Sequence, residues 1–230
     1  VPYGTTVTAL VATFTLSDGA SAKVEATDQT SGTTANDFSS AVTYTVTAED
    51  SSTQGWTVTV TIDASLVGGL YEGGIVAYIL QSEDDDYVTG ETHGLIAAET
   101  DQSIGIIWAL EAYQETEVTG TLLTIGSGSA NTDKIIAQND PDDTGIDTYA
   151  AGLARAYRGG GHADWFLPSI EELNELWLNK VAIGSFADFF YWSSSEGSAD
   201  SAWGRNFGIG GQGGNYSKNG PLQVRAVRYF

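Results

Sequence analysis

The side chains best suited to acid-base or metal chemistry are two histidines, His93 and His162. The chain of 230 residues contains no cysteine, which excludes thiolate ligands and cysteine nucleophiles. Zinc sites and general-base catalysis combine histidine with carboxylates at characteristic spacings, and no such spacing joins these two histidines. We therefore expect a protein that is not an enzyme and has no catalytic residues.

Two acidic segments have the oxygen ligands that Ca²⁺ prefers. They are Glu83, Asp84, Asp85 and Asp86, and then Asn139, Asp140, Asp142 and Asp143. Neither follows the spacing of an EF-hand, and the Glu-Pro-Asn and Gln-Pro-Asp motifs of calcium-dependent animal lectins are absent. We expect solvated loops and no cofactor or metal, with Ca²⁺ as the lesser alternative.

The segment GRNFGIGGQGG at 204–214 has glycine spacings like those of a dinucleotide-binding loop. That loop follows a strand, opens a helix and precedes an acidic residue, and this segment does none of these. Its glycines have two explanations that the sequence leaves open. They serve turns that need positive φ, or they are alternatives reached by altering adenines in an Asn-like codon.

Charge is distributed unevenly along the chain, whose net charge is −21. All 30 acidic residues precede position 201, whereas residues 201–230 carry only Arg205, Lys218, Arg225 and Arg228. An acidic body repels nucleic acid and anionic membranes, so we expect no nucleic-acid partner. No apolar run is long enough for membrane insertion, and the absence of an initial Met indicates a processed or truncated form.

Residues 1–63 alternate in the manner of half-buried strands, for example AVTYTVTAED and GWTVTVTI. Val42, Tyr44 and Val46 share one face, and clusters of Gly, Asp, Ser and Asn mark the turns. A small antiparallel sandwich is expected. The glycines of segment 64–74 mark a boundary, after which GGIVAYIL and HGLIAAE read as apolar strands.

Three helices are expected in the second half: ANTDKIIAQN, DTYAAGLARAY with Asp147 as its N-cap, and SIEELNELWLNK. In the last, Ser169 and Glu172 form a capping box and Lys180 lies at the negative end of the helix dipole. The remaining segment, YWSSSE through QVRAVRYF, reads as short strands between polar loops, ending in one regular strand. The fold class is therefore α+β.

The first of these regions, from VPYGTTVTALVATFTLSDGA to GWTVTVT, resembles a bacterial immunoglobulin-like repeat of surface proteins. The resemblance implies a β-sandwich module at 1–66 that serves as a spacer. Such repeats have one or two further strands before VPYGT, so the module is expected to be truncated at its N-terminus.

The second region resembles the C-type-lectin-fold domain at the C-terminus of bacterial collagen-like surface adhesins, a family shared with the variable proteins of diversity-generating retroelements. TGTLLTIGSGSANTDKIIAQND, AAGLARAYRGGGHADWFLPSIEELNELW, FADFFYWSSSE, AWGRNF and QVRAVRYF carry the likeness, which spans 71–230. It implies that the strand near 75–80 pairs with a terminal strand at 223–230 and that 193–222 forms an exposed ligand-binding face. The formylglycine-generating enzymes of this fold depend on cysteines, which this chain lacks.

On that face Trp192, Trp203 and Phe207 should point inward, whereas other residues should contact a ligand, with Tyr216 as the exposed anchor. The predicted ligand-binding residues are Ala199, Ser201, Gly204, Arg205, Gly208, Ile209, Gly211, Gly213, Asn215, Tyr216 and Asn219.

Three functions remain open. The first is a retroelement-diversified protein, extracellular or on a cell or virion surface, that binds a protein or glycan on another cell or host. The second is an adhesin of fixed specificity that binds glycans, including sulfated ones through Arg205 and Lys218. The third is a purely structural surface domain.

Overall fold

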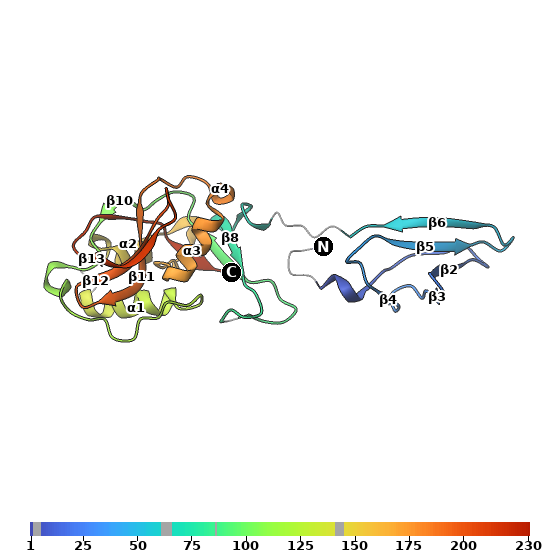
Figure 1. Ribbon diagram of the computed structural model, residues 1–230, viewed down its shortest axis with the longest axis horizontal. Helices are drawn as coiled ribbons and strands as arrows, with labels where there is room; N and C mark the ends of the chain where they lie inside the picture. Colours follow the sequence, from blue (N-terminus) through green and yellow to red (C-terminus); the bar gives the residue numbers. More distant parts are fainter. Residues whose placement is uncertain (2–5, 61–65, 86, 141–144) are drawn as a thin grey trace. The chain divides into compact units, whose positions relative to one another are not determined.

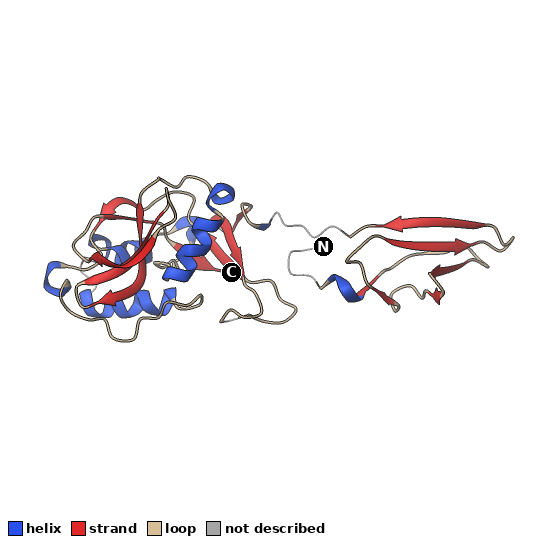
Figure 2. Ribbon diagram, viewed as in Figure 1, coloured by secondary structure: helices blue, strands red, loops and turns tan. Residues whose placement is uncertain are grey.

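The computed structural model describes residues 1, 6–60, 66–85, 87–140 and 145–230. The chain forms two compact units, Val1–Ala64 and Ser65–Phe230. Figure 1 shows strands in both units and labels the α-helices in the second, whereas the short blue helix of the first unit in Figure 2 is a 3-10 turn. The architecture is therefore mixed α and β.

The N-terminal unit is built from short antiparallel strands. They are preceded by the helical turn η1 (Val7–Ala9) and are β1 (Leu10–Val11), β2 (Ser21–Val24), β3 (Thr27–Asp28), β4 (Ala35–Asn36), β5 (Val42–Thr47) and β6 (Thr53–Val58). One sheet has the order β3-β2-β5-β6, and β1 pairs with β4. Alternation in β5 buries Val42 and Tyr44 while Thr43 faces solvent, which confirms the predicted period of two.

The C-terminal unit contains two sheets with helices packed beside them. Its strands are β7 (Leu70–Tyr71), β8 (Gly74–Ile79), β9 (Gly94–Ala97), β10 (Ser103–Ile106), β11 (Phe190–Ser198), β12 (Ser201–Asn206), β13 (Gln212–Ser217), β14 (Leu222–Val224) and β15 (Val227–Tyr229). Its α-helices are α1 (Gly128–Asn139), α2 (Ala150–Ala156), α3 (Ile170–Leu178) and α4 (Lys180–Ile183). Its 3-10 turns are η3 (Glu111–Tyr113), η4 (Ile146–Thr148) and η5 (Gly159–Gly161).

Strand order in the two sheets is β15-β9-β8-β7 and β10-β14-β11-β12-β13. The predicted pairing of 75–80 with the terminal strand is wrong, because β9 lies between β8 and β15. The terminal segment is also two strands rather than one. At Arg225 and Ala226 the chain leaves β14, which pairs with β10, and enters the other sheet, so the C-terminus lies near β8 (Figure 1).

Buried tryptophans tie distant loops of this unit together. Trp108, Trp165 and Trp192 are fully buried. Trp108 Nε1 donates to the Ser193 carbonyl and Trp192 Nε1 to the Ile106 carbonyl, each at 2.8 Å. These reciprocal bonds join the segment around β10 to β11, because a buried indole N–H requires an acceptor.

Helix α3 begins with the predicted capping box. The Ser169 hydroxyl accepts from the Glu172 backbone N–H, and the Glu172 carboxylate accepts from the Ser169 backbone N–H. The prediction that Asp147 is the N-cap of the second helix is wrong. That residue lies in η4, and helix α2 starts after Tyr149. Among the helices of the described residues, none has the length and apolar character to cross a membrane.

Candidate ligand-binding face

The predicted face lies at one edge of the five-stranded sheet, on β12, on the edge strand β13 and on the turns that flank them. We call this region, residues 198–220, the β12–β13 edge. Antiparallel pairing of β12 with both neighbours holds its backbone rigidly, since Arg205 pairs with Tyr191 on one side and Gln212 on the other.

The turn between β12 and β13 is fixed by hydrogen bonds of a single residue. Asn206 Oδ1 accepts from the backbone N–H groups of Gly208 at 2.8 Å and Ile209 at 3.1 Å. The Asn206 backbone N–H donates to the Gly211 carbonyl at 2.7 Å. Ile209 at the tip is 85% exposed. A rigid turn therefore presents an aliphatic side chain to solvent.

Most of the predicted ligand-binding residues are accessible, as the following burial classes show. Ala199, Gly208, Ile209, Gly211, Asn215 and Asn219 are exposed, and Gly213 and Tyr216 are half-buried. Tyr216 was expected to be an exposed anchor, but its ring packs against Phe190 with centroids 5.1 Å apart, and burial raises its pKa. The large apolar side chain that is exposed at this edge is Ile209.

Three predicted ligand-binding residues are buried, and their outward placement is wrong. Ser201 Oγ lies 3.1 Å from the Gly214 carbonyl oxygen, to which it donates. A side chain on Gly204 would lie 2.9 Å from the Tyr191 carbonyl oxygen. Arg205 stacks over the Trp177 ring at 4.2 Å and donates to the Gln212 side chain. These residues stabilise the sheet and are not available to a ligand.

All four basic residues of the C-terminal segment are buried. Lys218 Nζ binds Glu196 Oε1 at 2.5 Å, Arg225 binds Asp101 at 2.7 Å, and Arg228 binds Glu72 and Asp164 at 2.9 Å. Three of the four cations are thus paired with carboxylates and Arg205 stacks on Trp177, so this segment does not form a positive surface. The prediction that Arg205 and Lys218 bind sulfated glycans is wrong, because Lys218 is fully buried and Arg205 is only 5% exposed.

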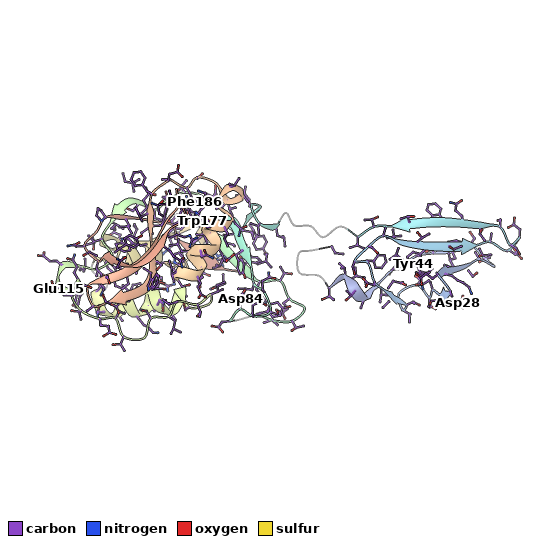
Figure 3. All side chains as sticks on the ribbon, in the orientation of Figure 1. Asp28, Tyr44, Asp84, Glu115, Trp177 and Phe186 are labelled. Carbon is purple, nitrogen blue, oxygen red and sulfur yellow. The ribbon has the colours of Figure 1, made fainter. Side chains whose placement is uncertain are left out.

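Large aromatic residues lie beneath the edge. Trp192 and Phe207 are fully buried, as predicted, whereas Trp203 is only half-buried. Figure 3 labels Trp177 and Phe186 in the C-terminal unit, and Phe186 packs on Phe207 with ring centroids 4.5 Å apart. This aromatic layer supports the turn that carries Ile209.

One exposed aromatic residue beside the turn was missed by the sequence analysis. Phe189 is 64% exposed, and its carbonyl accepts from the Phe207 N–H at 2.8 Å, which places it next to the turn. The signal was the run FADFFYW, since a single strand end has more aromatic residues there than it can bury.

His93 and the first acidic segment make structural contacts. His93 lies between the Phe230 carbonyl oxygen at 3.1 Å and Glu91 at 2.8 Å, and the Glu91 carboxylate raises the pKa of His93. Asp84 accepts from the Tyr78 hydroxyl at 2.7 Å. No group of three potential metal ligands occurs in the parts of the chain that the structure describes, which exclude Asp86, Asp142 and Asp143.

Comparison with known proteins identifies two families. Residues 98–228 match the Lcl C-terminal domain, and residues 1–60 match the family described as SGBP, N-terminal. No curated protein matches the chain.

One solved structure with a similar arrangement is a fimbrial protein from Bacteroides ovatus ATCC 8483, with 13% sequence identity and a TM-score of 0.46. The comparison covers 92% of this chain and 64% of that protein, so the chain spans less than two thirds of its length. The Lcl match, in contrast, covers more than half of the chain and includes the entire β12–β13 edge. The protein therefore belongs to the Lcl C-terminal domain family.

Proposed function

We propose that this protein is a non-catalytic surface protein that binds a target through the β12–β13 edge. The observation that carries the proposal is the separation of roles at this edge. Buried groups such as Arg205 and Lys218 hold the backbone, while Ile209, Asn215 and Asn219 are exposed on the turns and edge strand. The exposed side chains can contact a partner, and they can be substituted without destabilising the sheet.

The chemistry of the edge favours a polypeptide target. Ile209 and Phe189 offer apolar contact area beside the turn, and the Asn215 and Asn219 amides offer hydrogen-bond donors and acceptors. Apolar anchors surrounded by polar groups are typical of protein interfaces. A glycan stacked on Phe189 is the alternative, and the experiment below separates the two.

Three finer features belong to the same proposal. The exposed positions of the edge are diversified by a retroelement, the protein is displayed on a cell or virion surface, and the N-terminal unit is an immunoglobulin-like spacer. Sequencing of the locus tests the first. A near-identical repeat of the segment encoding the edge, together with a reverse transcriptase gene, is expected, and absence of both would refute diversification.

A matched pair of variants tests the binding face. Ile209 and Ile104 are 85% and 90% exposed, and Ile104 lies on β10, at the opposite edge of the same sheet. The labelled full chain is applied to protein and glycan arrays, and bound targets are then titrated with the variants. Ile209→Asp should weaken binding at least about tenfold, whereas Ile104→Asp should leave it unchanged.

The outcomes are distinct. Retained binding in Ile209→Asp, or an equal loss in both variants, would contradict the proposed face. Binding confined to glycans would replace the polypeptide target by a carbohydrate one. If the chain bound nothing on the protein array, on the glycan array or on host cells, this result would support a purely structural domain.

A further inference from the structure

The core face of the N-terminal sheet is uncovered at its edge strand, β6. All six residues of β6 are exposed. Trp56 is nevertheless paired with Tyr44, and Val58 with Val42, so both point to the face that carries the buried core. Trp56 is 62% exposed and Val58 39%. Among residues 6–60, which the structure describes, no layer covers this tryptophan and this valine on the core side of the sheet.

A groove follows from this missing cover. One part has a volume of about 380 Å³ and runs between Trp56 and Val58 of β6 and the segment 12–16, whose Ala12, Phe14 and Leu16 are half-buried. An adjoining hollow of about 620 Å³ shares Trp56 and Leu16 with it and ends at Asp18, Glu49 and Asp50. We call the two together the β6 groove. It is apolar at one end and acidic at the other.

The backbone beside the groove is open to pairing. Strand β6 is the last strand of its sheet, and its pairing in the part of the chain that the structure describes is with β5. An edge strand presents unpaired N–H and C=O groups along one side. A strand added there would receive backbone hydrogen bonds from β6 and direct every second side chain into the groove.

We propose that the β6 groove binds an extended segment of a partner protein as an added β-strand. The segment has alternating apolar residues that cover Trp56 and Val58 and a lysine or arginine that reaches Asp18, Glu49 and Asp50. Backbone pairing provides the affinity. The apolar pockets select the sequence of the bound segment, and the acidic end of the groove selects the direction in which it lies.

Charge decides against a second copy of this chain as the occupant. Lys23 is the only basic residue in positions 1–64, and it pairs with Asp28 at 3.2 Å. Hydrogen bonds from Ser52 hold the pKa of Asp50 below its usual value, so this carboxylate is charged at neutral pH. A second copy paired through its own β6 would bring no basic residue in that strand, and its Asp18, Glu49 and Asp50 would add three further carboxylates.

The test uses the full chain and synthetic peptides. A fluorescein-labelled octapeptide of three Thr-Val repeats followed by two lysines is titrated by anisotropy. One control peptide has proline in place of the central valine, and another ends in two glutamates. The first should bind at least about tenfold more tightly than either control, because proline removes a backbone donor and glutamate is repelled.

Two exposed neighbours on β6 provide matched variants, since Trp56 faces the groove and Thr57 faces away. Trp56→Lys should abolish binding and Thr57→Lys should retain it, with circular dichroism confirming that both fold. Peptide binding should also slow amide hydrogen exchange in residues 53–58.

Equal affinity for the three peptides, or binding without protection of 53–58, would overturn the proposal. The proposal would also be overturned if the chain bound none of the peptides but formed dimers in a concentration-dependent way, and if Trp56→Lys removed this dimerisation. The occupant of the groove would then be a second copy of the chain. The proposal is independent of ligand binding at the β12–β13 edge.

Discussion

Replacement of Lys218 tests whether the basic residues of the C-terminal segment stabilise the fold rather than bind a ligand. Lys218 Nζ is fully buried and donates to Glu196 Oε1 at 2.5 Å, to the Ala199 carbonyl at 2.6 Å and to the Thr116 carbonyl at 2.8 Å. It also lies 5.0 Å from the centre of the Trp108 ring. One ammonium group thus joins three separate segments.

The magnitude follows from what Lys218→Met leaves behind. Glu196 is 6% exposed at its side chain and would retain the Val118 N–H as a donor while losing its cation. Removing one partner of a buried ion pair costs about 3–5 kcal/mol, because the remaining charge is uncompensated. The methionine fills a similar volume, so lost packing adds little to this cost.

Urea denaturation of the full chain, followed by near-ultraviolet circular dichroism, measures the free energy of unfolding. Lys134→Met is the control, because Lys134 binds the Gly120 carbonyl at the surface and should contribute less than about 1 kcal/mol. Adding Glu196→Gln to Lys218→Met should restore about 1–3 kcal/mol, since the two sites are coupled. A loss below about 1 kcal/mol in Lys218→Met would refute the structural role.

Three further changes have measurable outcomes. Gly210→Ala should cost about 1–3 kcal/mol in urea denaturation, because φ is +78° and the new Cβ would lie 2.3 Å from the Trp177 ring, whereas Gly211→Ala should be neutral because nothing lies within 4 Å. Similar costs at both would contradict this difference. The hydrogen bond from Arg228 lowers the pKa of Asp164, so the stability lost in Asp164→Asn should be full above about pH 4 and should disappear as pH falls through that lowered pKa. A loss that does not diminish as pH falls below about 4 in acid titration of unfolding would oppose this origin. Ser169→Ala removes the capping box of α3 and should cost about 1–2 kcal/mol by thermal unfolding, and an unchanged midpoint would show that the cap is dispensable.

Local sequence patterns predicted the strands and helices in which buried and exposed residues follow a regular period. Alternation in β5 identified Val42 and Tyr44 as core residues, and the Ser169–Glu172 spacing identified the start of α3. Each signal depends on neighbours within a few residues, so tertiary contacts are not needed to interpret it.

The orientation of β12 could not be predicted in this way. Ala202, Gly204 and Arg205 are all buried, because Trp177 of α3 covers Arg205 on one face of β12 and the Leu222 and Tyr216 side chains cover Gly204 on the other. A strand covered on both faces loses the alternation that distinguishes inward from outward positions. The assignment of Gly204 and Arg205 to the ligand-binding face failed for this reason.

The long-range ion pairs could not be predicted from the sequence either. Lys218 meets Glu196, Arg225 meets Asp101, and separations along the chain give no signal of either contact. The switch of the terminal segment between two sheets at Arg225 has the same cause, because strand partners from distant segments determine it.

The proposed function requires that the β12–β13 edge separate exposed variable positions from buried supporting ones. Saturation mutagenesis of the edge, scored by resistance of the full chain to proteolysis, measures this without knowledge of the ligand. Substitutions at Ile209, Gly211 and Asn219 should change stability by less than about 0.5 kcal/mol, whereas those at Arg205 and Lys218 should cost more than about 2 kcal/mol. Equal tolerance of the two groups would contradict the account.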